Sequence, residues 1–274
     1  MNNKPILFLD SGIGGLLYCS DFQNKNPDEE VCHIADRKNF PYGPRTKEEL
    51  SSILILLTEE LMLKFNPKII VLACNTATVS AIESLRKHFP EIPFVGTVPA
   101  IKPALFASKN GKIGILGTAR TIEDPYNQNL VKDNITQDEN KYKIFSAAAP
   151  ELVEFIEQKI DKADEKEKSE MVKKYMDFFR EKGVDTLVLG CTHFLYLLEE
   201  FKNEAAPSIV IFDSLDGITK RIEFLLDEKN GCLRAAGNSC PSNKIIITGN
   251  REPDSIWINR AQALGYKLNL LCDV

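Results

Sequence analysis

The feature that most constrains this chain is the alternation of short apolar runs with longer amphipathic stretches. In stretches such as Lys47–Lys64 and Ser169–Lys182, apolar residues recur at three- and four-residue steps, which is typical of helices with one buried face. Strands that alternate with such helices predict an α/β fold with mostly parallel sheets covered on both faces. The apolar runs that we expect to form strands are Ile6–Leu9, Val31–Ala35, Ile69–Ala73, Pro93–Val95, Lys112–Leu116, Tyr142–Ser146, Thr186–Leu189, Ile209–Phe212 and Lys244–Thr248.

The length, composition and charge of the chain limit the number of domains and the kinds of partner that we expect. A chain of 274 residues suggests two domains, and 43% hydrophobic with 27% charged residues is ordinary globular composition. The formal charge of -5 comes without a basic stripe, so a nucleic-acid partner is disfavoured. A small anionic substrate stays possible, because a few amides and hydroxyls can hold a carboxylate locally.

The expected compartment is the cytoplasm. No apolar run approaches the roughly 18 residues that span a bilayer. The opening MNNKPILFLD is too short for a signal peptide and reads as the first strand. Seven cysteines, an odd number without a disulfide-framework spacing, predict reduced thiols.

Unusual polar residues follow four of the expected strands. The strand at Ile6–Leu9 runs into DSGIGG, and the strand at Lys112–Leu116 runs into GTART. VLACNTA around Cys74 resembles VLGCTHF around Cys191. Ligands of parallel sheets bind beyond the carboxyl ends of the strands. The repeat of VLACNTA as VLGCTHF predicts two similar α/β halves, and each half has a cysteine where a strand ends.

The domain boundaries carry no Gly/Ser linker. Gly96–Pro99 is a candidate crossover, and the chain from about Asp213 returns to complete the first half. We therefore expect a discontinuous first domain, 1–98 with 213–274, and a second domain, 99–212. The charge-rich segment Asp161–Glu170 is typical of a solvated loop or a helix start.

Cys74 alone admits two interpretations. A cysteine that ends an apolar strand is more often a small core residue than a nucleophile. Asn75 and Thr76, however, are expected to open a helix, and a helix N-terminus lowers a thiol pKa from its free value of about 8.5. Their polar groups are also suited to fixing an amino acid.

Cys191 strengthens the chemical interpretation. With His193 it resembles half of a metal site, but the chain lacks the CxxC or HxxxH spacing that zinc requires. It also resembles a cysteine–histidine hydrolase pair, although no oxyanion or Asn/Asp partner stands out. Two similarly placed thiols fit better a reaction that needs a base on one face of the substrate and an acid on the other.

Inversion at an α-carbon is such a reaction. Without a cofactor as electron sink, the carbanion must be stabilised electrostatically in a dry site. A thiolate removes the proton from one face, and a thiol delivers a proton to the other. Nearby acids and His193 would set which thiol is ionised.

The remaining motifs are less specific indications of function than the two cysteine motifs. DSGIGG lacks the third glycine of GxGxxG and the GK[ST] of a phosphate loop. Asp10 and Ser11 either face the site or cap a helix. Asp36 follows Val31–Ala35 at the same sheet edge and is expected to be an exposed acid, whereas Pro41-Tyr42-Gly43 resembles an ordinary surface turn.

Taken together, the motifs resemble the bacterial glutamate racemases of the aspartate/glutamate racemase superfamily across nearly the whole chain. The matching segments, in order, are LDSGIGG, DRKNFPYGPR, VLACNTAT, FVGTVPAIKPA, GILGTART and LVLGCTHF. The resemblance implies a homodimeric isomerase, independent of pyridoxal phosphate and without cofactor or metal, that supplies D-glutamate for peptidoglycan, and hence for cell wall and cell shape. It also implies two three-layer α/β domains related by a pseudo-two-fold, with the active site in the cleft between them.

The resemblance also assigns roles by position. Cys74 matches the thiol that acts on D-glutamate, with Asp10 and Asp36 beside it, and Cys191 with His193 matches the thiol that acts on L-glutamate. Glu157 matches the family's acidic helper, although Ala149 and Glu154 replace the usual cysteine and proline of that motif. The positions that match substrate-holding residues are Asp10, Ser11, Tyr42, Gly43, Asn75, Thr76, Thr118, Thr121, Thr192 and His193.

Two alternatives remain open. An aspartate racemase-like enzyme would keep both thiols but bind a shorter acid, and nothing in the residues themselves fixes the side-chain length. A non-catalytic amino-acid-binding relative would keep the fold, but pure binding needs no acid–base pair at both strand tips.

Overall fold

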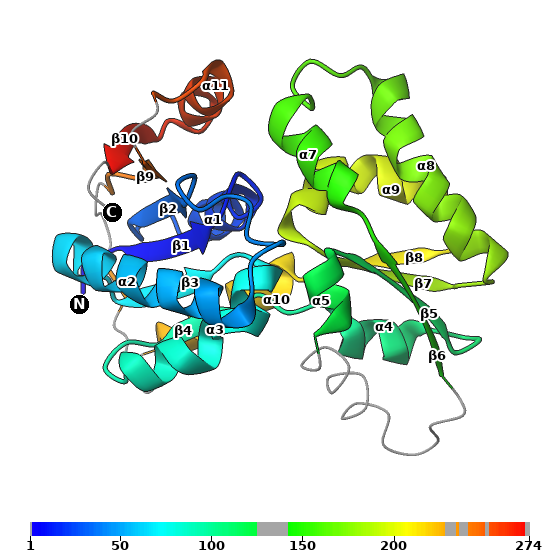
Figure 1. Cartoon of the computed structure of the whole chain (residues 1–274), viewed down its shortest axis with the longest axis horizontal. Helices are drawn as coiled ribbons and strands as arrows, with labels where there is room; N and C mark the ends of the chain where they lie inside the picture. Colours follow the sequence, from blue (N-terminus) through cyan, green and yellow to red (C-terminus); the bar gives the residue numbers. More distant parts are fainter. Residues whose placement is uncertain (1, 125–141, 228–233, 236–240, 250–251, 272–274) are drawn as a thin grey trace. The chain divides into compact units, whose positions relative to one another are not determined.

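The computed structural model describes residues 2–124, 142–227, 234–235, 241–249 and 252–271. The chain forms two compact units (Figure 1). Unit 1 is Met1–Thr97 with Leu215–Val274, and unit 2 is Val98–Ser214. Each unit has its own parallel sheet with helices on both faces, so the α/β fold expected from the alternating pattern is confirmed.

The sheet of unit 1 has the strand order β10-β9-β2-β1-β3-β4. All of its paired strands are parallel, which requires a crossover connection between each strand and the next. Its strands are β1 (Ile6–Asp10), β2 (Val31–Ala35), β3 (Ile69–Leu72), β4 (Phe94–Gly96), β9 (Lys244–Thr248) and β10 (Lys267–Leu271).

Alternate side chains of β1 point to opposite faces of this sheet. Leu7 and Leu9 belong to the apolar cluster that α2 and α3 cover, whereas Phe8 packs against Phe22 of α1 on the other face. A capping box at Thr46 fixes the start of α2. The helices of unit 1 are α1 (Leu16–Lys25), α2 (Lys47–Phe65), α3 (Asn75–His88), α10 (Leu215–Leu225) and α11 (Ser255–Leu264).

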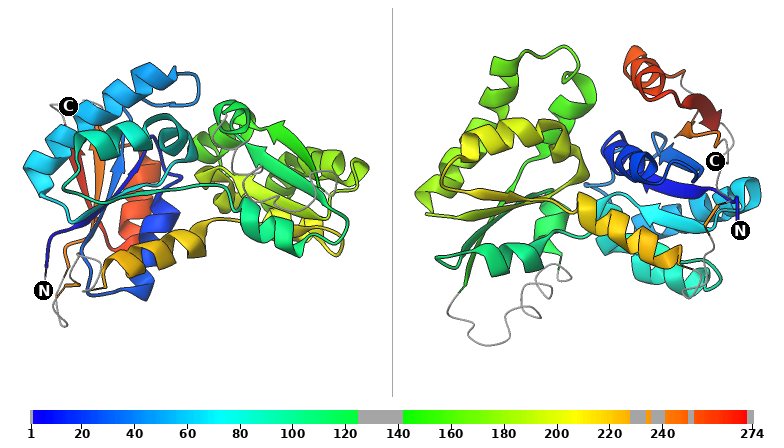
Figure 2. Two further views of the ribbon diagram at one scale, coloured as in Figure 1. Left: turned by 90° about the horizontal axis from the view of Figure 1, so that it is seen from below. Right: turned by 180° about the vertical axis from the view of Figure 1, so that it is seen from behind.

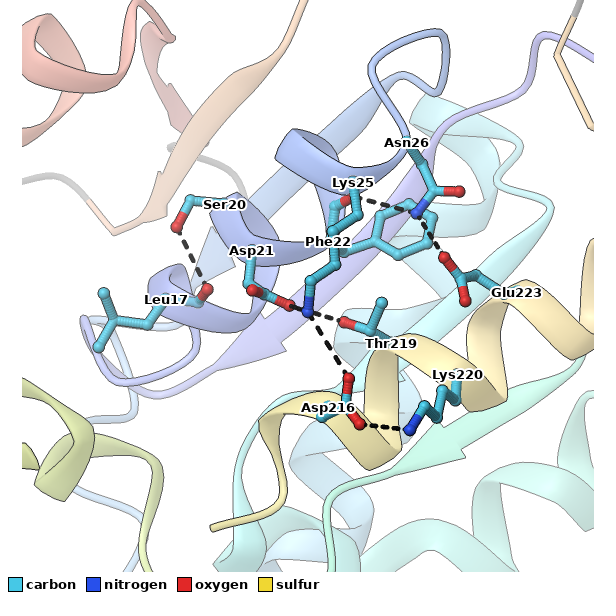
Figure 3. A network of polar contacts seen from close by, with 10 residues as sticks. All are labelled: Leu17, Ser20, Asp21, Phe22, Lys25, Asn26, Asp216, Thr219, Lys220 and Glu223. Atoms are coloured by element: carbon cyan, nitrogen blue, oxygen red, sulfur yellow. Dashed lines mark hydrogen bonds and ion pairs between the residues drawn. The ribbon is translucent and has the colours of Figure 1, made fainter.

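Polar contacts attach the returning helix α10 to α1 (Figure 3). The Oδ2 atom of Asp21 accepts hydrogen bonds from the Nζ atom of Lys25 and the Oγ1 atom of Thr219, both at 2.9 Å. One turn further on, the Nδ2 atom of Asn26 donates to the Oε1 atom of Glu223 at 3.1 Å. These contacts fix the chain where it re-enters unit 1.

Unit 2 has a four-stranded parallel sheet of order β6-β5-β7-β8. Helix α4 packs on one face, and α8 and α9 lie together on the other (Figure 2). The strands are β5 (Lys112–Gly117), β6 (Lys143–Ala148), β7 (Thr186–Gly190) and β8 (Val210–Phe212). The helices are α4 (Ile101–Ala107), α5 (Ala119–Glu123), α7 (Pro150–Gln158), α8 (Glu165–Glu181), the 3-10 helix η2 (Thr192–Leu197) and α9 (Leu198–Ala205).

The two sheets share one topology. The order β2-β1-β3-β4 in unit 1 corresponds, strand for strand along the chain, to β6-β5-β7-β8 in unit 2. The cysteine motifs follow the corresponding strands β3 and β7. The internal duplication inferred from two heptapeptides therefore extends to the whole four-stranded core of each unit.

Two strands differ from the sequence-based expectation, and the helix start expected in the charged segment is confirmed. Strand β10 has no counterpart among the expected runs, because its burial alternates along KLNLL at the sheet edge. The expected strand Tyr142–Ser146 is shifted to Lys143–Ala148, a partly exposed edge strand. The charged segment Asp161–Glu170 contains the start of α8, where Asp164 forms a capping box with Glu167.

Candidate active site

Both cysteines of the repeated motif occupy the N-cap position of the following helix. Cys74 precedes α3, and Cys191 precedes η2; both backbones are extended, with φ of -148° and -143°. Both are free thiols that are almost buried, at 7% and 6% exposure. The expectation that Asn75 opens a helix is confirmed. Because a helix N-terminus carries partial positive charge, each position favours a negatively charged sulfur.

The glycine-rich turn brings Asp10 to the strand tip that carries Cys74. The Oδ1 atom of Asp10 accepts hydrogen bonds from the backbone amides of Ser11 at 2.6 Å and Gly12 at 3.4 Å. A Cβ atom at Gly15 would lie 2.8 Å from the Cβ atom of Ala73 and 3.0 Å from that of Asp10. Only glycine permits this close approach, which sets Asp10 beside the residue that precedes Cys74.

Neither Asp10 nor Ser11 caps α1. The N-cap of that helix is Gly15, which makes no side-chain capping bond. The capping interpretation was therefore wrong for both residues. Each is buried, Asp10 fully and Ser11 at 5% exposure.

Asp36 and Tyr42 are buried, so the expectation of an exposed acid was wrong, whereas the turn at Pro41-Tyr42-Gly43 has an exposed proline and buries only its tyrosine. Asp36 is 0% and Tyr42 is 1% exposed, because the Tyr42 ring joins the core cluster of unit 1. The Asp36 carboxylate accepts hydrogen bonds from Asn39 Nδ2 at 3.0 and 3.2 Å, Tyr42 Oη at 2.8 Å and Thr248 Oγ1 at 2.6 Å. Burial, and then the charge of Asp36, raise the pKa of Tyr42 well above its ordinary value, so the phenol stays a donor.

Asn75 offers an unused acceptor beside Cys74. Its side chain is 3% exposed, and its Oδ1 atom has no hydrogen-bond partner among the described residues. A buried carbonyl oxygen without a donor costs free energy, so the position favours a ligand that brings an N–H group. Thr76, the next residue of α3, is buried at 4% exposure.

The matching tip in unit 2 carries a histidine and a carboxylate. The Nδ1 atom of His193 lies 3.8 Å from the Sγ atom of Cys191, and its Nε2 atom lies 2.7 Å from the Oε1 atom of Glu157. Glu157 reaches this position from the last turn of α7, although Ala149 and Glu154 depart from the family's motif there. Burial acts to lower the pKa of His193, but hydrogen bonds to Cys191 and Glu157 outweigh it and raise that pKa well above its ordinary value.

Hydroxyl groups and a turn glycine complete the two tips. Thr118 caps α5, and its Oγ1 atom lies 2.9 Å from the Oγ1 atom of Thr121. Thr192 is buried at 1% exposure next to Cys191. Gly43 follows Tyr42 in a partly buried turn, and a Cβ atom there would meet nothing within 4 Å.

The structure therefore gathers the predicted residues into two sets, one in each unit. Unit 1 holds Asp10, Ser11, Asp36, Tyr42, Gly43, Cys74, Asn75 and Thr76, and unit 2 holds Thr118, Thr121, Glu157, Cys191, Thr192 and His193. Sequence reasoning missed two supporting residues of unit 1. They are Thr248, which donates to Asp36, and His33, whose Nε2 atom lies 3.0 Å from the Gly12 carbonyl oxygen. A histidine inside an apolar strand was a usable signal for His33.

The described residues offer neither a membrane span nor a metal site. No helix in those ranges is long and apolar enough to cross a membrane. In the same part of the chain, no three side chains of His, Cys, Asp or Glu gather in a way that could hold a metal ion.

Comparison with known proteins identifies the family. The model of the Asp/Glu/Hydantoin racemase family matches residues 22–220. A glutamate racemase of Roseiflexus sp. is 32% identical over 270 residues, covering 98% of this chain and 94% of that protein. A glutamate racemase of Shewanella piezotolerans is 36% identical over 245 residues, covering 89% and 88%.

A solved structure agrees with these relatives. The crystal structure of Escherichia coli glutamate racemase, in complex with L-glutamate and the activator UDP-MurNAc-ala, has a TM-score of 0.85 at 28% identity and covers 98% of each chain. Sequence and fold thus match over almost the full length. The chain belongs to the Asp/Glu/Hydantoin racemase family and, within it, to the glutamate racemases.

Proposed function

We propose that this protein interconverts L- and D-glutamate by a two-base mechanism in which Cys74 and Cys191 act on opposite faces of the α-carbon. The observation that carries the proposal is the shared topology of the two sheets, with a nearly buried thiol at the N-cap after each corresponding strand. The proposal requires both tips to close on one substrate molecule. Membership of the glutamate racemases supports glutamate as that substrate.

In the L-to-D direction, Cys191 is the base. Its thiolate removes the α-proton of L-glutamate, and the electron pair stays on the substrate as a carbanion delocalised into the carboxylate. The raised pKa of His193 favours the cationic ring, and in the proposal this cation beside Sγ stabilises the thiolate. Glu157 holds that ring from the far side through Nε2.

Cys74 then completes the inversion. Its thiol delivers a proton to the opposite face of the carbanion and becomes a thiolate. The product therefore leaves Cys191 protonated and Cys74 ionised, and exchange with solvent restores the starting state. In the proposal Asp10, at the same tip, assists proton movement at Cys74, and Asp36 acts by holding Tyr42; the packing of Gly15 against Ala73 and Asp10 supports the first role.

The polar groups at both tips fit the charges of glutamate. In the proposal the unused Oδ1 atom of Asn75 accepts a hydrogen bond from the α-ammonium group. Hydroxyl donors suit the two carboxylates, since each carboxylate oxygen accepts hydrogen bonds. The residues that we assign to this binding are Ser11, Tyr42, Gly43, Thr76, Thr118, Thr121, Thr192 and His193.

The direct test is to incubate the purified protein with L-glutamate and separate the enantiomers. We expect D-glutamate to form until the two enantiomers are equal. Racemisation should continue unchanged after added pyridoxal phosphate, nicotinamide cofactors or chelators. Activity that is lost on exhaustive chelation and restored by zinc would instead favour a metal role for Cys191 and His193.

Aspartate is the alternative substrate. Parallel assays with L-aspartate and L-glutamate discriminate the two acids, and a higher kcat/KM for aspartate would overturn the assignment. Binding of glutamate without any inversion would favour a non-catalytic relative. Both outcomes are read from the same separation of enantiomers.

The proposal also includes a cellular compartment and an oligomeric state. We assign the protein to the cytoplasm as a homodimer that supplies D-glutamate for peptidoglycan. The mass of the native protein, measured by light scattering, should be twice the 30.8 kDa of one chain. A monomer that is fully active would contradict the dimer without affecting the two-thiol mechanism.

A further inference from the structure

His33 is a buried histidine that the mechanism above does not use. It lies in the middle of β2 with 0% exposure, between the sheet and α11. Its Nε2 atom lies 3.0 Å from the carbonyl oxygen of Gly12. Because a carbonyl oxygen can only accept, Nε2 carries the proton and donates it to this bond.

The acceptor belongs to the turn that holds Asp10. The amide of Gly12 donates to the Asp10 carboxylate, while the carbonyl of Gly12 accepts from His33. Gly12 is thus buried and hydrogen-bonded through both its amide and its carbonyl group. Glycine has more backbone freedom than any other residue, so these two bonds help to restrict its conformation.

The imidazole ring is itself fixed by the C-terminal part of the chain. Trp257 of α11 stacks on His33, with ring centroids 6.2 Å apart and planes at 20°. Trp257 is 3% exposed and is the single tryptophan of the sequence. Contact with a rigid aromatic partner leaves the His33 ring little freedom to rotate away from Gly12.

We propose that His33 is a positioning residue for the Cys74 face of the site: it fixes the Gly12 carbonyl and, through this turn, the Asp10 carboxylate. This inference rests on the proposed function, since it assigns Asp10 and Cys74 to one face of the substrate. Loss of the His33 donor leaves the protein folded but loosens the turn. Proton transfer at Cys74 then slows, and proton transfer at Cys191 does not.

Two variants separate positioning from packing. His33→Phe keeps a planar ring against Trp257 and removes the donor, whereas His33→Gln supplies a side-chain N–H that can reach Gly12. His88→Gln is the matched control, because His88 is a half-exposed histidine at the end of α3. Tryptophan emission and thermal unfolding of each variant verify that the packing around Trp257 persists.

Turnover distinguishes the variants. We expect His33→Phe to lower kcat about tenfold, the order expected for one lost hydrogen bond, with KM changed less than about twofold. His33→Gln should recover most of kcat, and His88→Gln should match the wild type. Wild-type kcat in His33→Phe, or equal losses in the Phe and Gln variants, would overturn the proposal.

Isotope effects give the face-specific readout. With α-deuterated D-glutamate, the labelled hydrogen is removed on the Cys74 face, so the isotope effect on kcat should rise in His33→Phe. With α-deuterated L-glutamate the effect should fall, because removal at Cys191 is then less rate-limiting. Equal changes from both enantiomers indicate a general structural defect and overturn the positioning role.

A measurement without turnover keeps this proposal separate from the proposed function. The ratio of iodoacetamide labelling rates at Cys74 and Cys191 should change at least threefold in His33→Phe and return in His33→Gln. If the wild type does not racemise glutamate, the proposed function fails, and this ratio still tests whether His33 sets the Cys74 face. An unchanged ratio overturns the inference about His33.

Discussion

The Nε2 atom of His193 lies 2.7 Å from the Oε1 atom of Glu157, and both side chains are almost completely buried, at 5% and 3% exposure. Because Nδ1 of the same ring faces Cys191, the imidazole connects a carboxylate to a thiol. The pKa of His193 is raised well above its ordinary value even though burial opposes this. The contacts with Cys191 and Glu157 therefore favour the charged form of the ring in the folded protein.

This raised pKa predicts a pH-dependent stability. A group whose folded pKa exceeds its unfolded value, about 6.5 for histidine, stabilises the fold fully below that value. The stabilisation is lost as pH rises through the folded pKa. We expect the difference in unfolding free energy between wild type and His193→Asn to be largest near pH 6 and to shrink at alkaline pH, measured by urea unfolding. A difference in unfolding free energy that grows with pH would contradict a raised pKa of His193.

The thiols should differ sharply in reactivity. Burial raises the pKa of Cys32 to about 12, and burial, followed by the proximity of the Cys32 thiol, raises the pKa of Cys19 well above its ordinary value. Iodoacetamide should therefore label Cys74 and Cys191 in the native protein, with glutamate protecting both, and leave Cys19 and Cys32 intact. Peptide mass spectrometry measures this pattern.

Replacement of the same thiols tests their roles in turnover. Cys74→Ser and Cys191→Ser should each lower kcat about 10²- to 10⁴-fold, the range for loss of a general acid or base. Cys19→Ala and Cys32→Ala should racemise normally. We also expect Cys232, Cys240 and Cys272 to be dispensable, and these three lie outside the described residues. An essential role for any of the five would place the site elsewhere.

A mechanism with two thiols predicts a specific pattern of deuterium incorporation at the α-carbon in heavy water. In heavy water, Cys191 takes hydrogen from L-glutamate, and Cys74, already exchanged with solvent, delivers deuterium to the D-product. Collapse backward returns the original hydrogen, because a closed site limits exchange. Early product should carry α-deuterium while remaining substrate carries little, in both directions. Substrate that gains deuterium as fast as product forms would indicate a single exchanging base.

Asp36 should matter more for stability than an exposed acid would. Within the described residues, each hydrogen bond of its carboxylate comes from a donor, so Asp36→Asn would set an amide N–H against Asn39, Tyr42 or Thr248. We expect a loss of about 1–3 kcal/mol in unfolding free energy, the cost of leaving a buried polar group unsatisfied. Thr248→Val, which removes one donor to Asp36 and the acceptor of the Lys38 amide, should cost less, because Asn39 and Tyr42 still donate to the carboxylate. A larger loss for Thr248→Val in urea unfolding would refute this order.

The buried ion pair of Lys68 and Glu29 should also contribute strongly to the free energy of unfolding. The Nζ atom of Lys68 lies 2.5 Å from the Oε2 atom of Glu29, with side chains 1% and 3% exposed. Lys68→Met should cost about 3–5 kcal/mol, because it leaves a buried carboxylate unpaired. The double variant Lys68→Met with Glu29→Leu should recover most of the lost unfolding free energy, because it removes the unpaired carboxylate as well.

The matched control is Lys64→Met, which breaks an exposed pair with Glu60 and should change stability by less than about 1 kcal/mol. Equal losses for the two lysine variants would show that burial does not set the strength of the Lys68 pair.

Much of the site could be predicted from the sequence because it is local. A strand that ends in Cys-Asn-Thr or Cys-Thr-His positions its own polar residues at the sheet edge, whatever the rest of the chain does. The thiols, the helix start at Asn75 and the glycine turn are of this kind. Apolar periodicity likewise predicted nine of the ten described strands, since it reflects burial along one segment.

Contacts between distant segments were decided only by the tertiary structure. Asp36 was expected to be exposed, but Thr248, 212 positions away, donates to it from the neighbouring strand β9. Glu157 meets His193 because α7 packs against η2, and Trp257 fixes His33 from a helix beyond the ninth strand. Sequence specifies which side chains a strand tip presents, whereas strand order and helix packing specify what surrounds them, because burial and hydrogen bonding depend on neighbours that only the folded chain brings together.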